Sequence, residues 1–302
     1  IAAQWFTLAA EQGHAQAQTN LAFLYEDGHG VQQNQKTAAK WFILAAEQGN
    51  ANAQSNLGRM YLAGEAVLQS YQTAFECFSK AAEQGHVEAQ YNLGIALRES
   101  GQIEEAKKCY EEVLIINPAY PNVHNNLGNI HLEQSNLNLA VEHFEWAVAY
   151  DPEFSTAYGN LGSSFLALGR IEDAVKNYEM VILLNPGAIE AHNNLGIALH
   201  KLGQIDRAVE LFKKAIKLNS NYSLAHNNLG NAYRDMGMLD ESVSSYKSAI
   251  DVKPDYAEAH NNLGNAYRDL GKAKESLKFY EKAILIDPDY KEAQNNLDKA
   301  KL

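Results

Sequence analysis

Asparagine recurs in this sequence with a spacing that could place carboxamides in rows on one surface. The main set holds one register position at intervals of 34 residues and consists of Asn92, Asn126, Asn160, Asn194, Asn228, Asn262 and Asn296. The position before it is often asparagine as well, in Asn125, Asn193, Asn227, Asn261 and Asn295. A third set lies one helical turn after the second, so it faces the same side, and it consists of Asn129, Asn231 and Asn265.

A carboxamide offers hydrogen-bond donors and an acceptor together, which is what a peptide backbone needs from a partner. Asparagine is only a middling helix former, so a column of it in helices requires a reason. One interpretation is that the rows bind an extended peptide without demanding particular side chains. The other is that the amides tie neighbouring helices together, or were copied with duplicated repeats. The sequence leaves both open.

A second series of chemically capable residues contains His124, His192, His226 and His260, with Tyr158 at the equivalent position. Equivalent side chains on successive repeats point the same way and do not converge, which argues against a shared metal ion and for packing of rings. Motifs for phosphate loops, zinc helices, nucleophile elbows and paired cysteines are absent from the sequence. We therefore predict no catalytic residue, no metal and no cofactor, and hence no enzyme within this chain.

The elements that carry these residues are repeats. A leucine after each main-set asparagine position marks the units, at Leu21, Leu57, Leu93, Leu127, Leu161, Leu195, Leu229, Leu263 and Leu297. The spacing is 36 residues twice and then 34 residues six times. Apolar residues recur at three and four, which is helical spacing. Such self-similarity predicts an array in which each unit is stable because its neighbours cover its apolar face.

Composition narrows the classes of partner. The 302 residues contain 25 Lys and Arg against 37 Asp and Glu, for a net charge of −12. This balance provides no basic stripe for nucleic acid or anionic lipid. No apolar run approaches the ~20 residues that span a bilayer, so membrane insertion is not expected. Cys77 and Cys109 fall on neighbouring predicted helices ~8–10 Å apart, too far for a disulfide.

The first units share one sequence motif. Ala-Ala-Glu-Gln-Gly stands at 9–13, 45–49 and 81–85, and Gly28-His-Gly-Val31 provides a turn. This spelling resembles the Sel1-like repeat. The second unit has Ala66 where the turn would have its second glycine, so we expect that turn to be distorted. The chain opens at Ile1, without a start methionine and in a second helix, so we expect a truncated N-terminus. The compartment stays open, with the cytoplasm favoured.

The 34-residue units share another spelling, in which Leu-Gly is followed by glycine, a small residue, an aromatic and a closing proline. The small residues allow helices to approach, the aromatic fills the space beside them, and proline ends the second helix. The spelling resembles the tetratricopeptide repeat. It implies an all-α, right-handed alpha-alpha superhelical solenoid of helix-turn-helix repeats. The expected organisation is Sel1-like repeats at 1–85, the first truncated, six tetratricopeptide repeats at 86–290, and a C-terminal capping helix at 291–302.

Two pairs in this region look like capping boxes for the helices that follow them, Asp255 with Glu258 and Asp289 with Glu292. The resemblance to the tetratricopeptide repeat also implies that the asparagine rows line the concave groove. Arg234 and Arg268, about two turns beyond the paired asparagines, make the C-terminal end of that groove more charged than its middle. We count these two arginines as expected peptide-binding residues, together with all members of the three asparagine sets except Asn295 and Asn296.

The asparagine column resembles that of the tetratricopeptide arm of O-linked N-acetylglucosamine transferases, which implies a ladder that holds extended substrate peptides. A carboxylate clamp of the chaperone-binding type is disfavoured, because the positions beside the main set carry no lysine or arginine. The predicted function is a non-enzymatic interaction scaffold that binds an extended protein or peptide segment in its groove. An alternative function is the substrate-recruiting arm of a larger enzyme such as an O-linked glycosyltransferase. Self-association is a further alternative.

Overall fold

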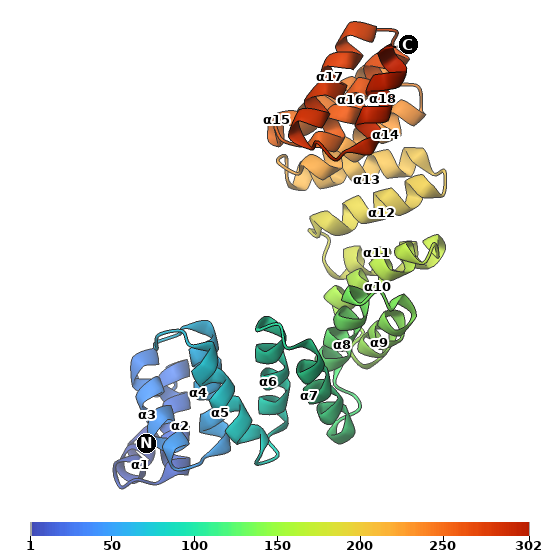
Figure 1. Cartoon of the computed structure of the whole chain (residues 1–302). Helices are drawn as coiled ribbons and strands as arrows, with labels where there is room; N and C mark the ends of the chain where they lie inside the picture. Colours follow the sequence, from blue (N-terminus) through green and yellow to red (C-terminus); the bar gives the residue numbers. More distant parts are fainter. Residues whose placement is uncertain (1, 302) are drawn as a thin grey trace. The chain divides into compact units, whose positions relative to one another are not determined.

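The computed structural model describes residues 2–301, and the regular elements in this range are eighteen α-helices (Figure 1). The chain forms two compact units, and the boundary between them lies between Asn136 and Leu137. The change in repeat spelling near Gly85 lies inside the first unit. Within residues 2–301, none of the helices is both long enough and apolar enough to cross a membrane.

The first unit holds eight helices. They are α1 (Ala2–Glu11), α2 (Ala15–Asp27), α3 (Gln35–Glu47), α4 (Ala51–Ala63), α5 (Tyr71–Ala82), α6 (Val87–Glu99), α7 (Ile103–Ile116) and α8 (Pro121–Glu133). The second unit holds the remaining ten. They are α9 (Leu137–Tyr150), α10 (Ser155–Ala167), α11 (Ile171–Leu184), α12 (Ile189–Lys201), α13 (Ile205–Leu218), α14 (Ser223–Asp235), α15 (Leu239–Val252), α16 (Ala257–Asp269), α17 (Ala273–Ile286) and α18 (Lys291–Lys301).

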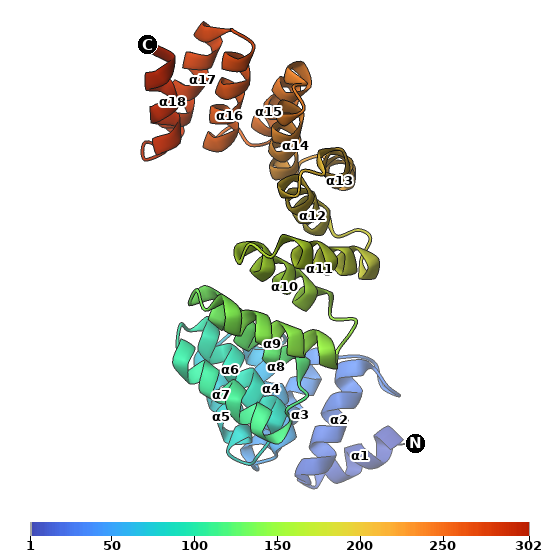
Figure 2. The same cartoon turned by 90° about the vertical axis from the view of Figure 1, so that its right-hand side faces the viewer.

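The helices pack as helix-turn-helix pairs that stack in chain order, so the all-helical solenoid expected from the sequence is confirmed. In the second unit α10 pairs with α11, α12 with α13, α14 with α15 and α16 with α17 (Figure 2). The first helix of each pair also contacts the first helix of the next, as α12 does α14 and α14 does α16. In the second unit the first helices therefore form one continuous row, α10, α12, α14, α16 and α18, which we call the inner row.

Packing within a pair depends on the glycine of the Leu-Gly dipeptide. A Cβ atom added to Gly230 would lie 2.5 Å from Cε1 of Tyr246, a residue of the second helix that is fully buried. The same close approach occurs between Gly58 and Phe78, Gly94 and Tyr110, Gly162 and Tyr178, Gly196 and Phe212, and Gly264 and Tyr280. Glycine is present because only a bare backbone lets the aromatic ring come so near.

The turns between helices use left-handed backbone at glycine, for example at Gly13, Gly49 and Gly85, whose φ angles are 90°, 87° and 80°. Among residues 2–301, two residues other than glycine adopt the same conformation, Ala66 and Ser135, both with a φ of 62°. Ala66 thus follows the backbone path that Gly30 follows with a φ of 75° in the preceding unit. The turn that we expected to be distorted keeps its shape, with the strain of a left-handed conformation placed on an alanine.

Candidate functional site

Asn227 connects two successive first helices of the inner row through both ends of its carboxamide. It lies on α14 and is 1% exposed. Its Oδ1 accepts a hydrogen bond of 3.1 Å from Nδ2 of Asn262 on α16. Its Nδ2 donates over 3.0 Å to Oε1 of Glu258, in the first turn of α16. One buried side chain therefore links its repeat to two groups of the next repeat.

The arrangement recurs along the inner row. Asn261, which is 0% exposed, accepts a hydrogen bond from Asn296 at 3.0 Å and donates to Glu292 at 3.1 Å. Asn193 accepts from Asn228 at 2.9 Å and donates to its neighbour Asn194 at 3.3 Å. We call this chain of side chains the amide ladder; its members are Asn193, Asn227 and Asn261 with Asn228, Asn262 and Asn296.

Two glutamates that accept hydrogen bonds from the amide ladder, Glu258 and Glu292, were predicted from the sequence to belong to capping boxes. That prediction is wrong for the helix that begins at Ala257. Tyr256 precedes this helix, and no side chain caps its first N–H groups. Glu258 accepts from Asn227 instead, and Glu292 likewise accepts from Asn261. The partner one repeat earlier, 31 residues away in the chain, could not be recognised from a local four-residue pattern.

The third asparagine set supports the aromatic core. The hydroxyl of Tyr246 donates to Oδ1 of Asn231 at 2.7 Å, and Tyr280 donates to Asn265 at 2.8 Å. In the first unit Asn126 of the main set donates to the hydroxyl of Tyr110, 3.4 Å away. These amides satisfy phenol groups that the packing of each pair has buried.

The main set keeps hydrogen-bonding capacity at the surface of the inner row. Asn194 and Asn228 are half-buried, and Asn262 is 9% exposed. A carboxamide has two N–H donors and an oxygen with two lone pairs, and Asn228 and Asn262 each use one N–H in the ladder. Of the other expected residues, Asn125 is buried in α8, and half-buried side chains are found at Asn92, Asn129 and Asn160.

The two arginines expected at the groove both contact one carboxylate. Nε of Arg234 donates to Oδ2 of Asp269 at 2.6 Å, and Nη2 of Arg268 lies 3.3 Å from Oδ1 of the same residue. Asp269 ends α16, so the pair Arg234 and Asp269 connects the C-terminal ends of α14 and α16. Partly exposed pairs of this kind contribute little to stability.

The histidine series caps loops. Nε2 of each ring lies within hydrogen-bond distance of a carbonyl oxygen six residues earlier: 2.9 Å from Pro118 for His124, and 3.0 Å from Pro186, Ser220 and Pro254 for His192, His226 and His260. A carbonyl only accepts, so the ring nitrogen donates. Among residues 2–301, no group of three or more His, Cys, Asp or Glu side chains could hold a metal ion.

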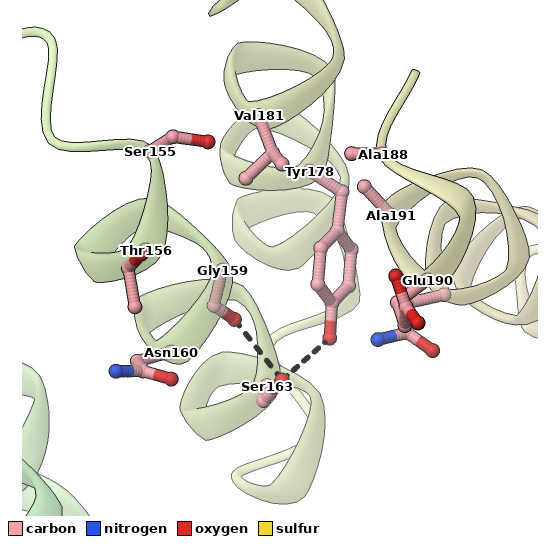
Figure 3. A pocket seen from close by; sticks show the side chains of 11 residues that line it. Ser155, Thr156, Gly159, Asn160, Ser163, Tyr178, Val181, Ala188, Glu190 and Ala191 are labelled. Atoms are coloured by element: carbon pink, nitrogen blue, oxygen red, sulfur yellow. Dashed lines mark hydrogen bonds between the residues drawn. The ribbon is translucent and has the colours of Figure 1, made fainter. Parts of the chain in front are cut away.

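A hollow of about 370 Å³ opens beside the main set between α10 and α12 (Figure 3). On α10 it is lined by Gly159, Asn160 and Ser163, and on α12 by Glu190 and Asn194. The Ser163 hydroxyl donates to the Gly159 carbonyl at 3.0 Å and lies 3.0 Å from the Tyr178 hydroxyl. Burial raises the pKa of Tyr178, so this phenol stays neutral near pH 7.

The sequence prediction contained Asn160 and Asn194 but missed the other residues that line this hollow, among them Gly159, Ser163 and Glu190. Gly159 and Ser163 occupy positions at which other repeats carry asparagine, as in Asn227 and Asn231. A small residue that interrupts a column of asparagines is the signal that could have revealed the hollow.

Family models match almost the whole chain. Models of the tetratricopeptide (TPR) repeat match residues 94–135, 125–181, 162–203, 189–222, 211–243, 230–271 and 257–290. The Sel1 repeat model matches residues 1–14, 15–50 and 51–86. This chain is a tetratricopeptide repeat protein with Sel1 repeats in its N-terminal part. Proteins of this repeat class are protein-binding scaffolds.

Solved tetratricopeptide and Sel1-like arrays resemble the chain at low identity. The TPR protein YrrB, described as having an unusual peptide-binding site, is 25% identical, with a TM-score of 0.51 over 64% of this chain and 98% of its own. PilF of Pseudomonas aeruginosa is 19% identical, with a TM-score of 0.60 over 70% of this chain and 97% of its own. The antigen c5321 of uropathogenic Escherichia coli is 23% identical, with a TM-score of 0.57 over 99% of this chain and 74% of its own. No match was found among curated proteins.

Proposed function

We propose that this tetratricopeptide array binds an extended peptide along its inner row and that Asn194, Asn228 and Asn262 hold the peptide backbone. The observation that carries the proposal is the state of Asn228 and Asn262. One N–H of each is fixed by the amide ladder, at 2.9 Å and 3.1 Å, while the second N–H and the oxygen remain for a ligand. Such side chains are already oriented, so binding loses little of their conformational entropy.

The spacing of the inner row suits an extended chain. Neighbouring helices pack roughly 8–10 Å apart, and an extended peptide advances ~3.3 Å per residue. One asparagine therefore meets about every third peptide residue, and the side chains between contacts remain unconstrained. Each contact contributes on the order of 0.5–1.5 kcal/mol, so affinity grows with the number of repeats engaged and tolerates many peptide sequences.

Charge favours a neutral or basic peptide. The chain carries a net charge of −12, and both expected groove arginines already contact Asp269. The likeness to YrrB, whose description includes a peptide-binding site, supports peptide binding by this type of array. Arg234 and Arg268 then act at the C-terminal end of the groove mainly by orienting its rim.

The test replaces Asn194, Asn228 and Asn262 together by alanine and measures, by titration calorimetry, binding of a peptide selected on the natural protein from a random library. We expect most of the affinity to be lost. The variant loses two ladder hydrogen bonds, but the helical circular dichroism spectrum should persist at 25 °C because the higher helix propensity of alanine offsets part of that loss. A control variant changes three exposed residues, Asn138, Lys214 and Lys274, to alanine and should bind as the natural protein does. Full affinity in the folded asparagine variant would refute the proposal.

The same inner row would also serve as the substrate-recruiting arm of a larger enzyme such as an O-linked glycosyltransferase. The column of main-set asparagines favours this candidate, since such an arm must accept many substrate sequences through their backbones. A reading frame that continues into a glycosyltransferase domain would decide for it. Self-association through the groove predicts instead that the mass measured by light scattering rises with protein concentration and that selected peptides reverse the rise.

A further inference from the structure

The amide ladder is interrupted at Gly159. This residue holds the register position of Asn193, Asn227 and Asn261 but has no side chain. In the complete links, Asn227 pairs with Glu258 and Asn262, which lie 31 and 35 residues further along the chain. The residues 31 and 35 positions after Gly159 are Glu190 and Asn194. Both groups that a ladder asparagine would join are therefore present, and only the connecting carboxamide is missing.

Packing does not require glycine at this position. A Cβ atom added to Gly159 would have one neighbour within 4 Å, Cγ2 of Val181 at 3.9 Å, which is an ordinary contact. On the same helix, a Cβ added to Gly162 would lie 2.8 Å from Cε1 of Tyr178. Glycine inside a helix lowers stability by roughly 1 kcal/mol relative to alanine. Gly162 has a structural reason for that cost, and Gly159 has none within its own fold.

Instead of a side chain, the structure has the hollow between α10 and α12. Figure 3 shows Gly159 on one side of it and Glu190 on the other. In the described part of the chain, the Glu190 carboxylate takes part in no hydrogen bond or ion pair, in contrast to Glu258 and Glu292. The side-chain nitrogen of Asn194 likewise donates to no described residue, although its oxygen accepts from Asn193.

We propose that the hollow receives an asparagine or glutamine side chain of the bound peptide, which completes the ladder in place of the missing carboxamide. The ligand's N–H donates to Glu190, and its oxygen accepts from Nδ2 of Asn194. This inference rests on the proposed function, because the peptide must already lie along the inner row.

The chemistry of the hollow selects against other side chains. An aspartate or glutamate would place a second carboxylate beside Glu190, and no lysine or arginine lines the hollow to offset it. An aliphatic side chain would fill the volume but would leave Glu190 and Asn194 without partners, which costs more than a missing contact. Sites built to hydrogen-bond a polar group discriminate strongly against analogues that lack it.

The test is selection of a random peptide library, about twelve residues long so that extended peptides span several helices, on the natural protein and on two variants. Gly159→Asn supplies the carboxamide from the protein itself, and Gly159→Ala adds a Cβ without one. Peptides selected on the natural protein and on Gly159→Ala should share asparagine or glutamine at one fixed position. Peptides selected on Gly159→Asn should lack this preference. The Gly159→Asn variant should also bind a peptide selected on the natural protein at least about tenfold more weakly than the natural protein does.

Folding is checked by melting temperature, which Gly159→Asn should raise by completing the ladder. Replacing the fixed glutamine or asparagine of the selected peptide by methionine or glutamate should weaken its binding to the natural protein and to Gly159→Ala. The same replacement should not weaken its binding to Gly159→Asn. Selected peptides without a fixed carboxamide, or a preference that survives in Gly159→Asn, would overturn the inference and leave the proposed function standing. A library that yields no binder at all would contradict the proposed function itself.

Discussion

Asn262 donates its side-chain amide to the carboxamide oxygen of Asn227, 3.1 Å away on the first helix of the preceding repeat. Both residues belong to columns that could serve either ligand binding or the cohesion of the array. The structure divides these roles by position. The buried asparagines join repeats to each other, and the main-set asparagines that they orient remain partly available at the surface of the inner row.

Removing a buried member of the ladder should destabilise the protein. Asn227→Ala leaves the amide of Asn262 without its acceptor in a site that is only 9% exposed. We expect a loss of about 1–3 kcal/mol, seen as a lower melting temperature by circular dichroism. Asn295→Ala is the matched control because Asn295 holds the same register position on α18 and is exposed, so the change should stay within about 0.5 kcal/mol. Equal effects of the two variants would show that the ladder does not contribute to stability.

Two glycines on α10 should respond to alanine in opposite directions. At Gly162 the new Cβ would lie 2.8 Å from the Tyr178 ring, and such overpacking costs about 1–3 kcal/mol. At Gly159 it would lie 3.9 Å from Val181, so the gain in helix propensity of up to about 1 kcal/mol should prevail. Thermal unfolding of Gly162→Ala and Gly159→Ala measures both signs. A decrease for both would mean that the backbone at Gly159 is also tightly packed.

The free energy of unfolding should decrease as the pH is lowered, in part because of His260. This ring is 5% exposed, its Nε2 donates to the Pro254 carbonyl, and its Nδ1 has no hydrogen-bond partner among the described residues. Burial lowers the pKa of His260, and the Lys282 ammonium acts in the same direction. The folded state thus favours the neutral ring, and the unfolded chain binds the extra proton. This contribution is complete above about pH 6.5, the ordinary histidine pKa, and declines below it.

Glutamine is the informative replacement for His260. Gln294 occupies the equivalent position on α18 and donates to the Pro288 carbonyl at 2.7 Å. His260→Gln should therefore keep the loop hydrogen bond and flatten the dependence of the melting temperature on pH below about 6.5. An unchanged pH dependence in this variant would show that other groups cause it.

Much of the fold could be predicted from the sequence because each repeat states the same packing rule. Gly230 and Tyr246 illustrate it: the glycine must be bare, and the aromatic must follow on the second helix at a fixed distance in the chain. Glycines such as Gly85, at the end of a repeated motif, likewise allow the turns to be predicted from the sequence. Ala66 was misjudged because the turn around it tolerates a left-handed alanine, which is a property of the surrounding backbone and not of the local spelling.

The site was predicted less completely because its decisive contacts join different repeats. Glu258 resembled half of a capping box, and only the fold shows that its partner is Asn227. The interruption of the asparagine column at Gly159 can be seen in the sequence, but only the fold shows that Glu190 and Asn194 line the hollow beside it. Periodicity shows which residues share a face, but it does not show which of them consume each other's hydrogen bonds.

The most direct test of peptide binding by the inner row follows the side-chain amide signals of the protein in nitrogen-15 NMR spectra during titration with a selected peptide. The signals are assigned from single Asn→Ala variants. Binding along the row predicts large shifts for Asn194, Asn228 and Asn262 and smaller ones for the buried Asn227 and Asn261. Unchanged signals of the first three residues, with shifts confined to the exposed faces of the second helices, would contradict the account.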